Sequence, residues 1–178
     1  MVDTKISALP SATTPLDGTE QVPIVQGGVT KKTTTNRLGS GPAFSAYADG
    51  TTQTLTDSTY NKVLFQTEEF DTNSNFASSR FTPTVPGYYQ INAQVLLGLS
   101  AITTAQIAVF KNGADFKEGA RMLLSGSSNA LAVSALVYLN GSTDYVEAYV
   151  APSGSSPNIL GGGNQQINYF QGSMTRGA

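Results

Sequence analysis

Two long stretches of the chain alternate between apolar and polar residues. The alternating apolar positions are Tyr89, Ile91, Ala93, Val95 and Leu97 in the first stretch and Val133, Ala135, Val137 and Leu139 in the second. Successive side chains of a β-strand point to opposite faces, so residues two apart share a face. The pattern therefore predicts two strands that each bury one face in a common core.

Shorter segments rich in β-branched and aromatic residues predict further strands. The full set of predicted strands is 62–65, 87–97, 105–110, 131–139, 145–150 and 167–174. Turn signals such as Pro86-Gly87 and Asn112-Gly113 separate them. Residues 116–124 contain Gly119 and are interpreted as a strand or loop rather than a helix, and residues 153–163 as a flexible loop. This spacing is typical of an all-β sandwich or barrel.

The opposite faces of the two long strands are uncharged. They carry Tyr88, Gln90, Asn92, Gln94 and Leu96 on the first strand and Ser134, Leu136 and Tyr138 on the second. A face open to water normally collects Lys and Glu. We therefore predict a subunit interface at Tyr88, Gln90, Asn92, Gln94, Leu136 and Tyr138. The alternative is that the face is neutral only because the whole protein is poor in charge.

The first 40 residues differ from the rest of the chain, because they are rich in Thr, Pro and Gly and hold only short apolar islands. Such islands bury too little apolar surface to offset the entropy lost on ordering. We expect an extended N-terminal attachment arm at 1–40 that needs a partner surface, and a globular head at 41–178. The predicted attachment residues are Ile6, Leu9, Val22, Ile24 and Val25. A disordered leader is the alternative.

The charge pattern excludes two classes of partner. Charged residues make up 12% of the chain, the net charge is -2, and the basic residues cluster only at Lys31-Lys32. Binding to nucleic acid needs a concentrated basic face, so we expect no nucleic-acid partner. No apolar run approaches the roughly 18 residues of a membrane span, and no signal segment begins the sequence. We expect no membrane partner and synthesis in a cytosol.

The chain lacks cysteine and histidine. This inventory excludes disulfides, thiolate catalysis, Ser-His-Asp relays and nearly all catalytic zinc sites. Glu68, Glu69 and Asp71 could form a glycosidase pair or a cation site, but we favour a solvated strand end because the chain has no Trp to stack on a sugar. Tyr88, Tyr89 and Tyr138 could stack on a glycan, although packing is the favoured role. We expect no enzyme, no catalytic residue, no cofactor and no metal.

Residues 42 to 175 resemble the globular head of the complement C-one-q family. The matching motifs are PAFSAY (42–47), KVLF (62–65), FDTNSNF (70–76), RFTPTVPGYYQINAQV (80–95), VFKNG (109–113), LVYLNGSTDYV (136–146) and FQG (170–172). The resemblance implies an antiparallel jelly-roll β-sandwich, related to the tumour-necrosis-factor fold, and a homotrimer. The turn at Gly141–Asp144 is one residue longer than in many members. The acidic cluster that often binds calcium in the family has no match here.

The first segment, KISALPSATTPLDGTEQVPIVQGGVTKKTTTNRL, resembles a segment at the N-terminus of many phage tail-fibre and virion proteins. The combination implies a bacteriophage virion structural protein: a homotrimeric head fibre, decoration protein or short fibre, held to other virion proteins by its arm. The alternative is a tail-fibre tip or receptor-binding module that recognises a host surface polysaccharide, and a carbohydrate-active enzyme is a third, weaker interpretation. No collagen-type repeat is present.

Overall fold

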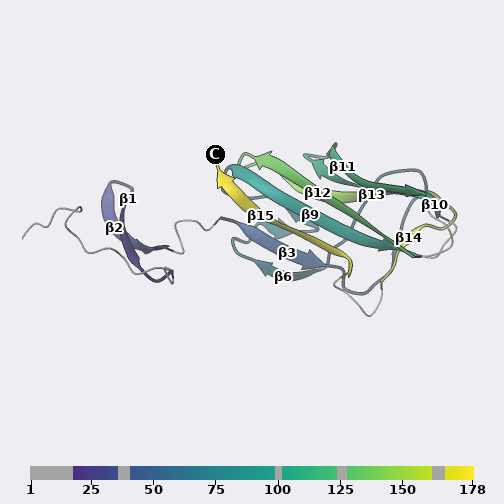
Figure 1. The fold of residues 1–178 in the computed structure, drawn as a ribbon, viewed down its shortest axis with the longest axis horizontal. Helices are drawn as coiled ribbons and strands as arrows, with labels where there is room; N and C mark the ends of the chain where they lie inside the picture. The colour runs from purple at the N-terminus through teal and green to yellow at the C-terminus, as the bar shows by residue number, and fades with distance from the viewer. Residues whose placement is uncertain (1–17, 36–40, 99–101, 124–127, 162–166) are drawn as a thin grey trace, which may run out of the picture. The chain divides into compact units, whose positions relative to one another are not determined.

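The computed structural model of the chain describes residues 18–35, 41–98, 102–123, 128–161 and 167–178 (Figure 1). The chain divides into two units, Met1–Ser40 and Gly41–Ala178. Strands dominate the described parts of both units. Within these ranges no helix has the length and apolar character needed to cross a membrane.

The larger unit folds into two antiparallel sheets. The first, here called the β9 sheet, contains β3 (Ala43–Tyr47), β4 (Gln53–Thr54), β6 (Thr67–Asp71), β9 (Gly87–Leu97), β12 (Asn129–Leu139), β14 (Asn158–Ile159) and β15 (Tyr169–Gly177). The second, the β10 sheet, contains β5 (Asn61–Lys62), β7 (Phe76–Ala77), β8 (Arg80–Phe81), β10 (Ile102–Lys111), β11 (Ala114–Leu123) and β13 (Val146–Gly154). In the β9 sheet, β9 pairs with both β12 and β15, and β15 pairs with β3. In the β10 sheet, β10 lies between β11 and β13.

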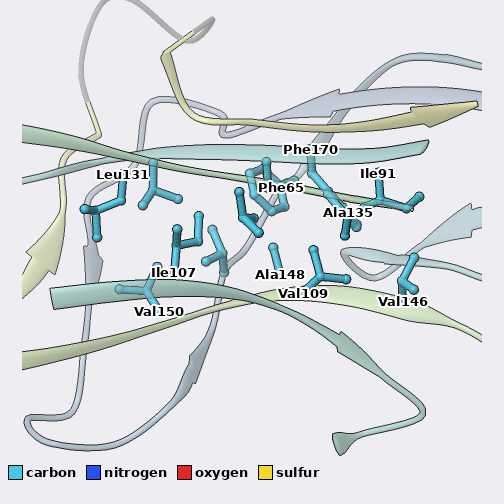
Figure 2. Packing of buried hydrophobic residues seen from close by; sticks show 14 of the residues in the cluster. Phe65, Ile91, Ile107, Val109, Leu131, Ala135, Val146, Ala148, Val150 and Phe170 are labelled. Carbon is cyan, nitrogen blue, oxygen red and sulfur yellow. The ribbon is translucent and has the colours of Figure 1, made fainter. Parts of the chain in front are cut away.

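The hydrophobic core lies between the two sheets, as Figure 2 shows. The alternating apolar positions predicted on β9 and β12 are all buried, so this prediction is confirmed. They meet Ile107 and Val109 of β10 and Val146, Ala148 and Val150 of β13. Each fully buried Val, Leu or Ile side chain among them stabilises the fold by about 1.5–3 kcal/mol relative to exposure.

An aromatic cluster fills one region of the core. The Phe44 ring stacks on Phe81 at a centroid distance of 4.3 Å and on Phe76 at 5.1 Å, and it meets the edge of Phe170 at 5.0 Å. These residues come from β3, β8, β7 and β15, which are far apart in sequence. Aromatic pairs in these geometries add about 0.5–1.5 kcal/mol beyond their area burial. The cluster therefore holds the two sheets together.

The predicted strand at 62–65 is shorter in the structure. Lys62 and Val63 still bond to β13, since Lys62 pairs with Tyr149 and the Val63 N–H donates to the Ala148 carbonyl at 2.9 Å. The next two amides find side-chain partners instead. The Leu64 N–H donates to Gln53 Oε1 at 3.0 Å and the Phe65 N–H donates to Ser79 Oγ at 2.8 Å. The ladder therefore ends because these side chains replace a neighbouring strand.

The prediction of a flexible loop at 153–163 is wrong in part. Strand β13 continues to Gly154, and Asn158–Ile159 forms β14, which pairs with β4 and with Leu97 of β9. Residues 162–166 lie outside the described residues. Alternation cannot reveal β14 because a two-residue strand shows no period.

Residues 114–123 form the strand β11, in agreement with the interpretation of this segment as strand or loop. Gly119 lies where β11 approaches β12. A Cβ atom added there would stand 2.5 Å from Val133 Cβ and 2.6 Å from the Ala132 carbonyl oxygen. The absence of a side chain at Gly119 therefore permits the close approach of these two strands.

The smaller unit contains a β-hairpin that was not predicted from the sequence. Strand β1 (Gln21–Gln26) pairs with β2 (Val29–Thr34) in antiparallel register. The two residues between them, Gly27 and Gly28, have φ values of 61° and 75°. Positive φ at both central positions is typical of the tight turns that join hairpin strands, and Gly-Gly between two β-prone runs is the signal for it. The described part of the predicted arm is therefore a hairpin.

Candidate functional site

The six residues predicted as a subunit interface share one face of the β9 sheet, on the side opposite the core. The register of β9 and β12 pairs Tyr88 with Tyr138 and Gln90 with Leu136, and Asn92 and Gln94 follow on the same face of β9. Leu136 is 54% exposed, Tyr88 42% and Tyr138 41%. The amide side chains are half-buried. The structure thus brings all six together on one open surface, here called the amide-aromatic face.

One end of the amide-aromatic face is hollowed. The rings of Tyr88 and Tyr138 lie 5.5 Å apart at 58°. Together with Leu136 and the chain end Thr175–Ala178 they line a hollow of about 540 Å³. The chain end was not among the predicted interface residues, because the predicted strand stopped at Met174. Strand β15 continues past a bulge there, and Thr175 Oγ1 donates to the Tyr88 carbonyl at 3.0 Å.

Neutral polar groups cover the middle of the face. Gln90 Nε2 donates to Ser134 Oγ at 2.8 Å, and Gln94 Nε2 donates to the Ile167 carbonyl at 3.1 Å. Strand β15 adds Gln171 and Ser173 beside Asn92 and Gln90. A second hollow of about 220 Å³ opens here, and its wall includes Phe70 of β6, which is 49% exposed. The face therefore combines exposed apolar groups with amides that bond to their own chain.

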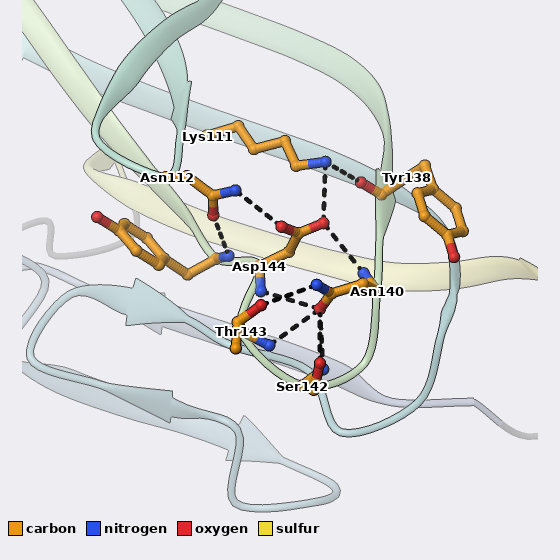
Figure 3. A network of polar contacts seen from close by, with 8 residues as sticks. Lys111, Asn112, Tyr138, Asn140, Ser142, Thr143 and Asp144 are labelled. Carbon is orange, nitrogen blue, oxygen red and sulfur yellow. Dashed lines mark hydrogen bonds and ion pairs between the residues drawn. The ribbon is translucent and has the colours of Figure 1, made fainter.

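The Tyr138 end of β12 is anchored by a polar network, shown in Figure 3. Lys111 Nζ donates to the Tyr138 carbonyl at 2.8 Å and forms an ion pair with Asp144 at 3.0 Å. Asn112 Nδ2 donates to Asp144 Oδ1 at 2.7 Å. These hydrogen bonds, first the one from Asn112 and then the one from Lys111, hold the pKa of Asp144 below its usual value despite partial burial. The network therefore fixes the backbone that carries Tyr138.

The turn at 140–144 is closed by its first side chain. Asn140 Oδ1 accepts hydrogen bonds from the backbone N–H groups of Ser142, Thr143 and Asp144 at 3.0, 2.9 and 3.0 Å (Figure 3). An Asn side chain that bonds to the following backbone is a common way to stabilise a turn. The three hydrogen bonds therefore fix the conformation of the turn.

The acidic cluster at 68–71 has structural partners. Glu69 accepts a hydrogen bond from Ser45 Oγ at 2.9 Å, and Asp71 accepts one from the Phe76 N–H at 2.6 Å. Glu68 is an exposed residue of β6. Within the described ranges, no three acidic or other metal-binding side chains lie together in a way that could hold a metal ion. These contacts agree with the interpretation of the segment as the end of a strand.

Tyr89 cannot stack on a glycan, because it is fully buried in the core. Its hydroxyl donates to the Val85 carbonyl at 2.7 Å, and burial raises its pKa to about 12. The suggestion that Tyr89 could hold a sugar is therefore wrong. Tyr88 and Tyr138 remain exposed.

A buried carboxylate on the β10 sheet was not expected from the sequence. Glu147 is 2% exposed and forms ion pairs with Lys62 at 2.6 Å and Arg80 at 2.8 Å. Burial acts to raise the pKa of Glu147, but the hydrogen bonds and charges of Lys62 and Arg80 together hold it below its usual value. Arg80 also lies over the Tyr145 ring at 3.8 Å. No local pattern marks this triad, since its members are far apart in sequence.

The predicted attachment residues fall partly within the described hairpin. Val22 and Ile24 share one face of β1 and are half-buried, whereas Val25 lies on the other face and is 73% exposed. Ile6 and Leu9 lie outside the described residues.

Comparison with known proteins identifies the fold of the larger unit. No protein-family model and no curated protein sequence matches the chain. Among solved structures, the globular domain of the zebrafish complement 1qA protein is similar, with 20% identity and a TM-score of 0.54 over 78% of this chain and 99% of that one. Murine APRIL gives 10% identity and a TM-score of 0.57 over 75% of this chain and 98% of that one. Eiger TNF from S. frugiperda gives 11% identity and a TM-score of 0.53, covering 78% of this chain and 95% of that one. These likenesses confirm the predicted complement and tumour-necrosis-factor type of jelly roll.

Proposed function

We propose that the chain is a structural protein of a bacteriophage particle, a homotrimeric head fibre, decoration protein or short fibre. The head at 41–178 forms the trimer, and the segment at 1–40 fastens it to other virion proteins. The observation that carries this proposal is the amide-aromatic face, an open sheet surface with the composition of a subunit interface.

The exposed apolar groups of this face support self-association. Monomeric proteins rarely leave contiguous apolar patches larger than a few hundred Å² open to water. Tyr88, Leu136 and Tyr138 are each about half exposed and are grouped around one hollow. Aromatic residues are enriched and charged residues depleted at interface centres. A second copy of the same chain would cover these groups.

The neutral middle of the face suits a threefold arrangement. In a cyclic assembly each residue near the axis is repeated in every copy, so any charge there would meet its own like charge. Gln90, Asn92 and Gln94 on β9 carry no charge, and their amides can donate and accept. The resemblance of the head to the trimeric complement C-one-q family supports three copies.

The resemblance of residues 1–40 to phage virion segments supports the attachment role. An isolated two-stranded hairpin is marginally stable in water. The β1–β2 hairpin also leaves Val25 and Val29 exposed, at 73% and 58%. Addition of strands to such a hairpin would satisfy backbone groups and cover apolar side chains. The segment therefore has the properties of an attachment strap that is ordered by its partner.

The proposal is tested by comparing the full chain with the head alone, residues 41–178, for binding to particles that lack the protein. The head is a separate unit with its own core, so both forms should be trimeric. Only the full chain should join the particle. If the head alone binds equally well, the attachment surface lies on the β-sandwich and the role given to residues 1–40 is wrong. The same comparison with host cells instead of particles tests the alternative of a receptor-binding module.

A further inference from the structure

The two outer edges of the β1–β2 hairpin differ in what they offer to an additional strand. In antiparallel pairs, hydrogen-bonded and non-hydrogen-bonded residue pairs alternate. Gln26 and Val29 flank the two-residue turn and form a hydrogen-bonded pair, so Ile24–Lys31 and Val22–Thr33 are hydrogen-bonded pairs too. The bond from the Thr35 N–H to the Glu20 carbonyl at 2.9 Å continues this alternation. The backbone groups of the intervening residues therefore point outward.

The outer edge of β1 lacks a backbone N–H donor at its centre. Its outward-facing residues are Gln21, Pro23 and Val25, and proline has no N–H. Proline in a strand is confined to edges, where it prevents a further strand from pairing. On β2, Thr30 and Lys32 face outward opposite Val25 and Pro23, each carries both a donor and an acceptor, and both are exposed. Only the β2 edge can extend the sheet by a regular ladder.

From this asymmetry we infer that the outer edge of β2, centred on Thr30 and Lys32, takes an extended acidic strand from another protein of the particle. This inference rests on the proposed function, and it specifies the edge of the strap that binds and the chemistry of its partner.

A second copy of the hairpin does not fit the β2 edge. A threefold ring would pair the β2 edge of one copy with the β1 edge of the next, where Pro23 interrupts the ladder. A twofold antiparallel pairing of two β2 strands about their centre must set outward-facing residues opposite each other, so it would place either Lys31 opposite Lys31 or Lys32 opposite Lys32. Like charges directly opposite each other destabilise a strand pair. The occupant is therefore a strand of a different protein.

The side chains of β2 define the partner further. The strand carries Lys31 and Lys32 and no carboxylate. An incoming strand with Asp or Glu beside Lys32 would gain a cross-strand pair of opposite charge. On the other face, Val29 and Lys31 lie with Val22 and Ile24. An apolar side chain of the partner at alternate positions would extend this surface.

The test uses Lys32→Pro in the full chain, because this change removes one outward N–H and leaves the internal ladder of the hairpin intact. It copies on β2 the arrangement that Pro23 has on β1. We expect binding to particles that lack the protein to weaken at least about tenfold, with the trimer unchanged in sedimentation. Lys32→Gln keeps the N–H and should weaken binding less. Pro23→Thr restores the donor on β1 and should bind as the wild type does.

The outcomes separate this inference from the function on which it rests. If Lys32→Pro binds like the wild type while the head alone fails to bind, the β2 edge is not the attachment edge, although the strap role stands. If the head alone binds, the strap role itself is wrong. Electron cryo-microscopy of wild-type particles gives an independent test that needs no variant. It should show a foreign strand hydrogen-bonded along β2, and a strand on β1, or one from the same trimer, would overturn the inference.

Discussion

Tyr88 and Tyr138 lie directly opposite each other on β9 and β12, with ring centroids 5.5 Å apart and planes tilted by 58°. Both rings stand on the outer face of the β9 sheet, and both remain about two-fifths exposed in the single chain. The pair forms the wall of the larger hollow. Contact between the exposed rings and water is unfavourable, and a neighbouring copy that packed on this face would bury their apolar surface.

Leu136 lies beside this pair, and we expect assembly to be sensitive to a charge at this position. We expect Leu136→Glu to convert the trimer to monomers at micromolar concentration, since burying an unpaired carboxylate costs several kcal/mol. Sedimentation measures the change, with the wild type at three times the chain mass of 18.6 kDa. The matched control is Leu123→Glu on β11, where the leucine is 86% exposed, and this variant should remain trimeric.

Two results would contradict this prediction. A wild-type chain that sediments as a monomer would exclude both the trimer and the role given to the amide-aromatic face. Equal loss of assembly in the Leu136 and Leu123 variants would show that the effect is not specific to this face.

Asp144 should act on assembly through the position of Tyr138. Asp144→Ala removes the partner of Lys111 and Asn112 at the end of β12. We expect a loss of about 1–3 kcal/mol in the free energy of unfolding, the usual cost of unmade hydrogen bonds to a charged group. Trimer dissociation should increase as well. Chemical denaturation and sedimentation measure the two effects, and Asp144→Asn should restore much of both because an amide oxygen can still accept.

The pH dependence of stability should depend on Glu147. Its folded pKa lies below the usual value of 4.5, so the carboxylate stabilises the fold above that pH. This contribution is lost as the pH falls through the lowered folded value. Glu147→Gln should reduce the free energy of unfolding by about 1–3 kcal/mol at pH 7. The difference from the wild type should narrow as the pH falls below 4.5, as urea unfolding over a series of pH values would show. A difference that stays constant with pH would mean that folding does not lower the pKa of Glu147, and would contradict this prediction.

Gly119 should tolerate no side chain. Gly119→Ala places a Cβ against the backbone of Ala132 and Val133, which cannot move aside like the end of a flexible side chain. We expect a loss of about 1–3 kcal/mol in the free energy of unfolding. The control is Lys117 on the same strand. Its side chain is exposed, so Lys117→Ala should change the free energy of unfolding by less than about 0.5 kcal/mol. Thermal unfolding measures the melting temperatures of the two variants. Similar values would contradict the close approach of β11 to β12 at Gly119.

The candidate site was predicted in part. The period-two pattern of β9 and β12 identified both their buried faces and the six residues opposite, because the side-chain direction in a strand follows from position alone. The other wall of the hollow, Thr175–Ala178, was missed. A bulge in β15 after Met174 shifts the register so that Arg176 pairs with Tyr88, and this brings the chain end to the hollow. No local sequence pattern marks a bulge at that place.

The sequence by itself determined the all-β class and the strand faces, since these depend on residue type and spacing. Only the tertiary structure decided which distant residues meet. Glu147 finds Lys62 and Arg80 across the β10 sheet, and Phe44 finds Phe81 and Phe170 between the sheets. Such contacts depend on strand order and register, which are set by the packing of the whole core and not by neighbours in the chain.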